Sequence, residues 1–415
     1  MKNIDLKSFS KSDNTVVNIT VLLIVWSVFQ GFPLLFGGVL NVIIGGKFSL
    51  IMSVIQAVLF VFFIYNYPSC FSRVNRIDVA CFTVSLVFIY VLLIICVGQV
   101  DNSLLFTGIG IVFLLLLRDD LKVECLKRFV KIISLVFTLS IIEFLIYITT
   151  HWGIVLYSGI ILGNADKTIV TYCNQYLFNF IVQLSDTPRF QSLCTEPGNV
   201  GTLCGMLLFI NRDSVSKYQY IIILVAGLLS FSLAFYVLFF LSILNGSRFS
   251  GTIIIYALLF IALYLLLWDF FEQRILFRLA GGYADNRITE DFSVQYNEAI
   301  RDGSILIPHG FDVSYGAGAK MWFWRYGVLS FVPVFYSYYH YYRAKVRQYN
   351  SLRWNSWVFF FAFWISFYQR HWIMNIDYLI IFFSVPILFS EGVVRQKKIV
   401  DRVSVSNMAI DNTCH

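Results

Sequence analysis

The sequence predicts an all-α membrane protein with about twelve transmembrane helices, and its composition and apolar runs support this. Of its 415 residues, 58% are hydrophobic and only 13% are charged, and the mean hydropathy is +0.74. Soluble domains carry about 25% charged residues. Apolar runs of close to 20 residues, the length that crosses a hydrocarbon core about 30 Å thick, recur along the chain. We interpret residues 1–390 as one transmembrane domain, followed by a polar cytoplasmic tail over residues 391–415.

The formal charge of +7 does not indicate a nucleic-acid-binding protein. The basic residues lie in short loops between apolar runs, where they set membrane orientation. The segment from Met1 to Thr15 is polar and mixed in charge, with neither a short apolar core nor a small-residue cleavage site. We therefore expect no removable signal peptide, and we expect the first span to act as the signal.

The apolar runs define the predicted spans. In the first half they are Val16 to Phe36, Leu50 to Tyr67, Ile77 to Val97, Leu104 to Leu117 and Phe129 to Thr149. In the second half they are Glu196 to Ile210, Tyr218 to Leu229, Leu233 to Leu244, Thr252 to Phe270, Ala317 to Tyr342, Trp354 to Tyr368 and Trp372 to Phe389. Two long loops remain, residues 150–195 and 271–316.

The distribution of Lys and Arg orients these spans. A cytoplasmic N-terminus places 21 of the 31 basic residues on the cytoplasmic side, as the positive-inside rule requires. The C-terminus is then cytoplasmic too, and both long loops are external.

The run Tyr218 to Leu244 is too short for two full helices with an ordinary loop, yet Ser230-Phe231-Ser232 interrupts it. One interpretation is a hairpin of two short helices whose break lines a cavity, because irregular backbone at membrane depth must face protein or water. The alternative is a single tilted or kinked helix. That alternative would place the basic loop from Arg343 to Arg353 outside, against the positive-inside rule, so we prefer the hairpin.

The thirteen residues Arg189-Phe190-Gln191-Ser192-Leu193-Cys194-Thr195-Glu196-Pro197-Gly198-Asn199-Val200-Gly201 lead from the first external loop into a helix. Proline fits the first helical turn, where its missing N–H would have no partner, so Glu196 or Thr195 falls at or beside the N-cap. Glu196 would then sit at the positive helix end. A capped interfacial helix with Arg189 as an ordinary anchor is the simpler alternative.

The predicted topology gathers polar residues on the external face. They are Arg189, Glu196, Ser230, Arg274, Arg278, Arg287, His309, Lys320, Arg325, Arg370 and His371. Arg274 and Arg278 would share one face of a helix and could clamp an anion, since guanidinium groups bind phosphate through a planar fork of donors. Contact with lipid headgroups is the alternative, and we prefer it for Arg274.

Arg325 lies within a predicted span, where a cation costs about 3 kcal/mol at the helix centre and needs a partner, a wet cavity or a snorkelling path. Arg370 and His371 occupy a very short external turn, which requires only polarity. His309, in a loop whose glycines allow close backbone approach, suits proton transfer near neutral pH, and Glu196 is the competing base. A nearby arginine would keep Glu196 ionised.

The eight cysteines form no CxxC motif or Cys/His cluster. Cys173 and Cys194 share an external loop in which a disulfide could form, but we prefer chance placement, because spacing alone says nothing about distance. No spacing of His, Asp, Glu or Cys indicates a metal site, and no phosphate-binding glycine loop lies on the cytoplasmic side. These observations argue against an ATP-driven pump.

This layout resembles the Wzy-type O-antigen and capsule repeat-unit polymerases, which share an architecture with the O-antigen ligases. The resemblance covers most of the chain as topology. At the residue level it rests on Arg189-x-x-Ser192-x-x-x-Glu196-Pro197-Gly198-x-x-Gly201, on the Ser230/Ser232 break, and on a later loop that carries Arg278 and Arg287 and ends in Gly310-x-x-x-x-x-Gly316-x-Gly318. The usual Glu-Pro-Asn of the family is Glu-Pro-Gly here, with Asn199 one step later.

The resemblance implies a membrane-embedded glycosyltransferase of the GT-C type, metal-independent and inverting, in the bacterial inner membrane. Its donor and acceptor would be undecaprenyl-diphosphate-linked oligosaccharides at the periplasmic face, and a chain-length regulator is a possible partner. It implies diphosphate binding by Arg189, Arg278, Arg287, Arg325 and Arg370, and a base that is either Glu196 or His309. It also implies a cavity lined by Ser230, Ser232, Asn199 and His371, and no cofactor.

Two other functions remain open at this point. An O-antigen ligase would use nearly the same site with lipid A-core as acceptor. A lipid-linked oligosaccharide flippase or another transporter would also have about twelve spans, but would be expected to carry charges through the midplane. We identified only Glu143, Asp269 and Arg325 as charges well within or close to spans, which weakens the transporter interpretation.

Overall fold

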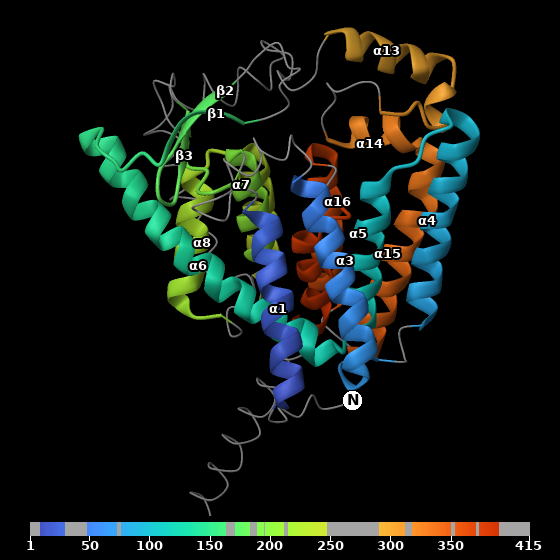
Figure 1. Ribbon diagram of the computed structural model, residues 1–415, viewed down its shortest axis with the longest axis horizontal. Coiled ribbons are helices and arrows are strands. Elements are labelled where there is room, and N and C mark those ends of the chain that lie inside the picture. Colours follow the sequence, from blue (N-terminus) through green and yellow to red (C-terminus); the bar gives the residue numbers. More distant parts are fainter. Residues whose placement is uncertain are drawn as a thin grey trace, which may run out of the picture.

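The computed structural model describes residues 9–29, 48–72, 76–162, 171–182, 189–194, 196–210, 215–246, 290–311, 318–349, 353–370 and 373–389. Helices predominate among these residues (Figure 1). The helices of the first half are α1 (Lys11–Val28), α3 (Phe48–Asn66), α4 (Arg76–Val97), α5 (Asn102–Leu116) and α6 (Asp119–Thr150). The first five predicted spans therefore correspond to helices. Helix α6 begins ten residues before its predicted span, with Asp119 and Asp120 in the first turn, where acidic side chains complement the helix dipole.

The second half contains shorter helices. They are α7 (Pro197–Leu207), α8 (Lys217–Leu229), α9 (Leu233–Gly246), α13 (Glu290–Arg301), α14 (Gly318–Tyr326), α15 (Val328–Tyr349), α16 (Arg353–Gln369) and a last helix, Ile376–Phe389. The predicted span Thr252 to Phe270 and the tail over residues 391–415 lie outside the described residues.

Helices α4 and α6 are long and apolar enough, by length and composition, to cross a membrane. Shorter apolar helices surround them, among them Lys217–Leu229 and Ile376–Phe389. Helix α4 turns apolar side chains outward, with Val84 66% and Ile95 75% exposed. Soluble proteins rarely expose such surface over a whole helix, so these helices suit a membrane environment. The number of twelve spans and their orientation stay predictions.

Ion pairs and hydrogen bonds show which helix ends lie together. At one end of the bundle, Asp13 near the start of α1 lies 3.5 Å from Arg118, which directly precedes α6. Asp78 near the start of α4 pairs at 2.9 Å with His340 in the second half of α15. At the other end, Asp101 before α5 accepts a 2.7 Å hydrogen bond from Tyr326 at the end of α14. Figure 1 shows α13, α14 and the strands together at this second end.

The architecture is mostly helical, as the all-α prediction requires, and the predicted first external loop adds a small antiparallel sheet. Its strands are β1 (Tyr157–Leu162), β2 (Thr171–Gln175) and β3 (Phe180–Val182), in the order β1-β2-β3. Glu143 of α6 fastens the turn between β2 and β3, because its carboxylate accepts hydrogen bonds from the Leu177 and Phe178 N–H groups at 2.9 and 2.8 Å. Glu143 is therefore an anchor for the sheet.

The predicted span Ala317 to Tyr342 is wrong as a single helix. It divides at Gly327, which has a φ of 76°, a conformation that glycine adopts without strain. A Cβ atom at Gly327 would lie 2.7 Å from the backbone of Leu306 and Ile307. Residues 306–307, from the predicted second external loop, thus cross at the division, and α14 packs against α13 through Phe292 and Trp324.

Candidate functional site

The predicted break between α8 and α9 is present, and the chain bends sharply there. Phe231 has a φ of 46°, and a Cβ atom at Gly227 would lie 2.0 Å from the ring of Phe235. Residues eight apart in a continuous helix are separated by about 12 Å, so this contact excludes one straight helix. Both α8 and α9 pack against α7. The hairpin interpretation is therefore the one that the structure supports.

Arg189 stabilises this break. Its Nε donates to the Ser230 carbonyl at 3.1 Å, and its Nη2 donates to the Phe231 carbonyl at 2.8 Å. The last carbonyls of a helix have no partner within the helix, so a guanidinium group is a fitting cap. The Phe190 N–H also donates to the Leu229 carbonyl at 3.1 Å. This arrangement gives Arg189 a structural role in addition to the predicted one.

The break packs tightly on α7. A Cβ atom at Gly201 would lie 2.3 Å from Ser232 Cβ and 2.8 Å from Ser230 Oγ. Both serines are buried, and Ser230 Oγ donates to the Gly227 carbonyl at 2.6 Å. These serines, predicted to line a cavity, lie against the glycine of the Glu196–Gly201 segment.

Glu196 and Arg370 form an ion pair at the start of α7. Glu196 is the N-cap residue, as predicted, but its side chain does not cap the helix. Its Oε2 instead accepts a hydrogen bond from Arg370 Nη1 at 2.7 Å, with the arginine side chain 11% exposed and the glutamate 43% exposed. The sequence predicted both residues for the site without predicting that they pair.

Gly198 makes room for the arginine. A Cβ atom at this position would lie 2.0 Å from Arg370 Nη2 and 3.0 Å from Arg370 Cζ. The guanidinium group therefore lies directly on the backbone of the first turn of α7. Glycine at position 198 therefore has a steric reason, since any larger residue would meet the guanidinium group.

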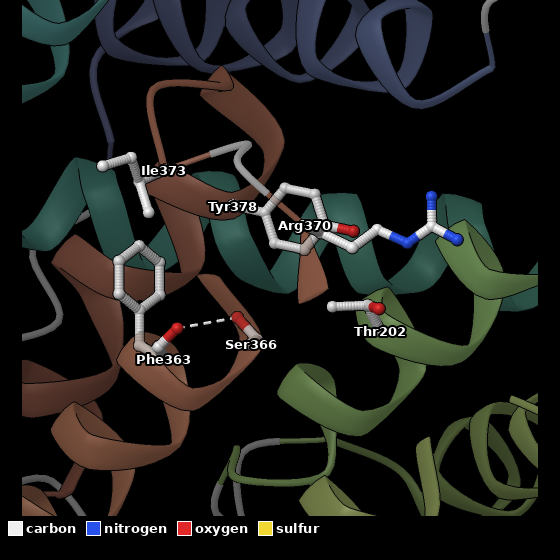
Figure 2. Close-up of a pocket in the computed structure, with 6 residues that line it drawn as sticks. All are labelled: Thr202, Phe363, Ser366, Arg370, Ile373 and Tyr378. Carbon is white, nitrogen blue, oxygen red and sulfur yellow. Dashed lines mark hydrogen bonds between the residues drawn. The ribbon is translucent and has the colours of Figure 1, made fainter. Parts of the chain in front are cut away.

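Arg370 also lines a small pocket between α7, α16 and the last helix (Figure 2). The pocket is narrow, with about 10 Å³ open to a water-sized molecule, room for about one water. Its lining residues are Thr202, Phe363, Ser366, Arg370, Ile373 and Tyr378. Figure 2 shows the Arg370 side chain extending toward α7, with the Tyr378 ring beside it.

The hydroxyl groups of this pocket are tied to their own helices. Thr202 Oγ1 donates to the Gly198 carbonyl at 2.9 Å, and Ser366 Oγ donates to the Phe363 carbonyl at 2.7 Å. A hydroxyl oxygen that donates one bond still has lone pairs to accept another. From α15, the Tyr338 hydroxyl donates to the Ile373 carbonyl and so holds the connection that follows Arg370.

Three further buried polar side chains lie in these segments, namely Gln191, Asn199 and Asp377. Asn199, predicted to line the cavity, is buried in the first turns of α7. Gln191 Nε2 and Asp377 Oδ1 have no hydrogen-bond partner within the described part of the chain. We did not predict either residue for the site. Asp377 is an additional charge in the predicted span Trp372 to Phe389, and that position within an apolar run is the signal that could have found it.

His309 and Arg325 belong to a second cluster, around α14. The His309 ring stacks on Trp324 with 4.3 Å between centroids. Its Nδ1 lies 3.1 Å from the Ile307 carbonyl and its Nε2 lies 3.1 Å from Ser304 Oγ. Because a carbonyl only accepts, this network assigns the proton to Nδ1. Arg325 lies 5.7 Å from the Phe311 ring, and its buried Nε has no hydrogen-bond partner among the residues described.

Asp302 lies beside this second cluster. Its carboxylate accepts the Ser304 N–H at 2.8 Å, and this bond, with the nearby His309, lowers its pKa below the ordinary value. None of the contacts just described for His309 involves Glu196 or Arg370. Of the two candidate bases, Glu196 therefore pairs with Arg370 and His309 stacks on Trp324.

Several predicted residues cannot be placed. Arg278, Arg287 and His371 lie outside the described residues. Cys194 is a free and buried thiol, which corrects the option of a disulfide with Cys173. The described residues contain no group of three metal-ligating side chains.

The comparisons with known proteins add no relative. No family model, no curated protein and no solved structure matches the chain.

Proposed function

We propose that this chain is a membrane glycosyltransferase that polymerises undecaprenyl-diphosphate-linked oligosaccharide repeat units at the periplasmic face of the inner membrane. The observation that carries the proposal is the Glu196–Arg370 pair, which holds a carboxylate and a guanidinium group 2.7 Å apart at the start of α7. Such a reaction needs a proton acceptor for the attacking hydroxyl and a cation for the leaving diphosphate. The pair supplies both groups in one place.

In the proposed reaction, a hydroxyl oxygen of one lipid-linked repeat unit attacks the anomeric carbon of the sugar on the other. The bond between that carbon and the diphosphate oxygen breaks, and undecaprenyl diphosphate leaves with the electron pair. The hydroxyl proton passes to the Glu196 carboxylate. Attack from the face opposite the leaving group inverts the anomeric configuration.

Arg370 is the proposed ligand of the leaving diphosphate. Its guanidinium group is only 11% exposed, and an ionic hydrogen bond strengthens where water is excluded. Guanidinium has five N–H donors in a planar fork, so it can hold Glu196 and a phosphate oxygen at once. The positive end of α7 adds to the same field. Arg278, Arg287 and Arg325 remain proposed ligands for the rest of the diphosphate, and Asn199 and His371 for the sugars.

Glu196 is the better supported base because its side chain is 43% exposed and lies beside the proposed leaving-group site. The ion pair with Arg370 holds the carboxylate in place at the start of α7. His309 is the second candidate. Its Nδ1 donates to the Ile307 carbonyl, and its Nε2 lies 3.1 Å from the Ser304 hydroxyl.

The proposal is tested by deleting the gene in its host and resolving the surface glycolipids on a gel, with and without the chain supplied from a plasmid. We expect deletion to leave core carrying a single repeat unit, and the plasmid to restore the ladder. Lipid-linked polymer that accumulates without attachment to core would instead show a ligase. An unchanged ladder would contradict both functions and favour a transporter.

Within that assay, Glu196→Gln and Arg370→Lys test the site. We expect each to lower polymer formation about 10²-fold or more, the size typical of losing a general base or a preorganised charge. Glu124→Gln is the matched control, because Glu124 also pairs with an arginine, Arg128, at 2.7 Å, but on α6 away from the site. His309→Gln distinguishes the two bases: if it abolishes polymer and Glu196→Gln does not, His309 is the base.

A further inference from the structure

Ser304 and His309 bring a hydroxyl group and an imidazole ring together in the predicted second external loop. Ser304 Oγ lies 3.1 Å from His309 Nε2, within hydrogen-bonding distance. Both residues are half-buried, so each side chain is held by its surroundings and can still be reached from outside. A histidine nitrogen beside a serine hydroxyl can take the hydroxyl proton and so turn the oxygen into a nucleophile.

A third group orients the imidazole ring. His309 Nδ1 lies 3.1 Å from the Ile307 carbonyl, and this nitrogen carries a proton because a carbonyl only accepts. The ring also stacks on Trp324, which is itself buried. The ring therefore presents Nε2 to Ser304 in a fixed orientation. A nucleophile, a base and an acceptor that orients the base follow one another here, as in serine hydrolases.

The backbone leaves one side of the serine open. Gly303 has a φ of 78°, a conformation that glycine adopts without strain, so the chain turns sharply just before Ser304. A Cβ atom at Gly303 would meet nothing within 4 Å among the described residues. The Ser304 N–H donates to the Asp302 carboxylate at 2.8 Å and steadies this turn. A small molecule can therefore approach Ser304 from the Gly303 side.

Asp302 adds a negative charge near the imidazole ring. The hydrogen bond from Ser304, and after it the nearby His309, lower the pKa of the Asp302 carboxyl below its ordinary value. The same attraction favours the cationic ring that forms when His309 takes a proton. Asp302 is fully exposed, so water screens the attraction and its contribution is small.

We propose that Ser304 and His309 form a catalytic dyad that hydrolyses carboxylic esters with a short acyl group. Ser304 Oγ attacks the ester carbonyl carbon while its proton passes to His309 Nε2. The bond between that carbon and the alcohol oxygen breaks, and the alcohol leaves with the proton from Nε2. A water molecule then attacks the acyl-serine and gives one proton to Nε2. The serine oxygen leaves, takes that proton back and releases the carboxylic acid.

The surroundings favour a short acyl group and separate this reaction from the proposed polymerisation. Leu306 and Ile307, which follow Ser304 closely in the chain, are 46% and 42% exposed and offer apolar contact to a few carbon atoms. Neither Ser304 nor His309 lines the pocket beside Arg370. The esterase activity therefore goes beyond the proposed polymerase, and its test requires no polymer.

The test is labelling of the purified full chain in detergent with a fluorophosphonate probe, which bonds covalently to activated serine oxygens. We expect the label on Ser304, located by mass spectrometry of peptides. Ser304→Ala should remove it, and His309→Gln should slow labelling about 10²-fold, the lower end for loss of a general base. The control is Ser69→Ala, which removes an exposed serine at the opposite end of the bundle and should leave the labelling rate unchanged.

Turnover gives a second readout. We expect the unchanged chain to hydrolyse p-nitrophenyl acetate about tenfold or more faster than Ser304→Ala prepared in the same way. Equal hydrolysis by the two proteins would overturn the proposal. Label that is absent from Ser304, or that forms equally fast in His309→Gln, would overturn it as well.

A cysteine at position 304 keeps the test decisive if Ser304→Ala does not fold. His309 should activate the thiol of Ser304→Cys as it activates the hydroxyl, because the thiolate is the reactive form. We expect iodoacetamide to alkylate Ser304→Cys about tenfold faster than Ser69→Cys, although position 69 is the more exposed. Equal alkylation rates would show that His309 does not act on position 304.

Discussion

At the scale of single residues, the candidate site depends on the absence of a side chain at Gly198. A Cβ atom at this position would lie 2.0 Å from Arg370 Nη2, so the guanidinium group occupies the space of a side chain. The sequence predicted that Glu196 stands at the start of a helix, because Pro197 marks the first turn. It did not predict the partner, since Arg370 is 174 residues away and no local pattern joins two such distant positions.

Gly198→Ala should therefore lower polymerase activity without lowering the amount of folded protein in the membrane. The added methyl group displaces the guanidinium group, so we expect polymer formation to fall as in Arg370→Lys, while the amount of protein in the membrane stays close to normal. Gly110→Ala is the control, because its new Cβ would meet Phe60 at an ordinary 3.5 Å. A Gly198→Ala protein with full polymerase activity would show that the pair does not contribute.

At the scale of elements, Arg189 and Gly201 both contact the break between α8 and α9. The sequence predicted the break from Ser230 and Ser232, and the structure adds the reason for its stability, namely the two carbonyls that Arg189 binds. That arginine was expected to bind diphosphate. Its hydrogen bonds to the backbone could not be predicted, because every residue has a carbonyl group and the sequence does not show which carbonyls lack a partner at a helix end.

Gly201→Ala should loosen this junction. The new Cβ would come within 2.3 Å of Ser232 Cβ, and overpacking of this kind costs about 1–3 kcal/mol. We expect a lower thermal unfolding temperature for the protein in detergent than for Gly110→Ala. If the two variants unfold at the same temperature, α7 does not pack on the break as described.

Glu143 gives a test of the small sheet. Its carboxylate accepts the Leu177 and Phe178 N–H groups, and charge-assisted hydrogen bonds are about twice as strong as neutral ones. We expect Glu143→Gln to speed hydrogen exchange at these two amides about tenfold, which corresponds to about 1.4 kcal/mol. Glu124→Gln should leave them unchanged. Equal protection in Glu143→Gln would mean that the sheet holds its turn without α6.

The elements that sequence analysis missed have a common physical cause. The predicted span Ala317 to Tyr342 divides at Gly327, where a distant segment, Leu306-Ile307, crosses the chain. The sheet in residues 150–195 likewise depends on contacts with α6. Apolar runs are a local property, and many of the predicted runs coincide with helices, whereas positions fixed by distant contacts were not predicted.

At the scale of the whole molecule, the two ends of the bundle differ in character. One end carries the pairs Asp13–Arg118 and Asp78–His340. The other carries the sheet, α13, α14 and the Glu196–Arg370 pair. The positive-inside rule predicts that the first end is cytoplasmic and the second external.

Cysteine labelling measures this orientation directly. In a chain whose eight native cysteines are replaced by serine or alanine, Val155→Cys reports the end with the sheet and Ser69→Cys the opposite end, and both positions are exposed. We expect a membrane-impermeant maleimide to label Val155→Cys in intact cells with a permeable outer membrane. Ser69→Cys should react only after the inner membrane is disrupted. The reverse pattern would invert the topology and contradict an external site.

Because Arg370 directly follows α16, the length of this helix limits which insertions and deletions the protein tolerates. Each residue added to or removed from a helix shifts the next stretch of chain by about 1.5 Å and turns it by about 100°. Arg370 must reach Glu196, while the next few residues must return the chain to the helix Ile376–Phe389. A single insertion or deletion in the last turn of α16 would therefore turn Arg370 away from Glu196 and uncouple it from α7.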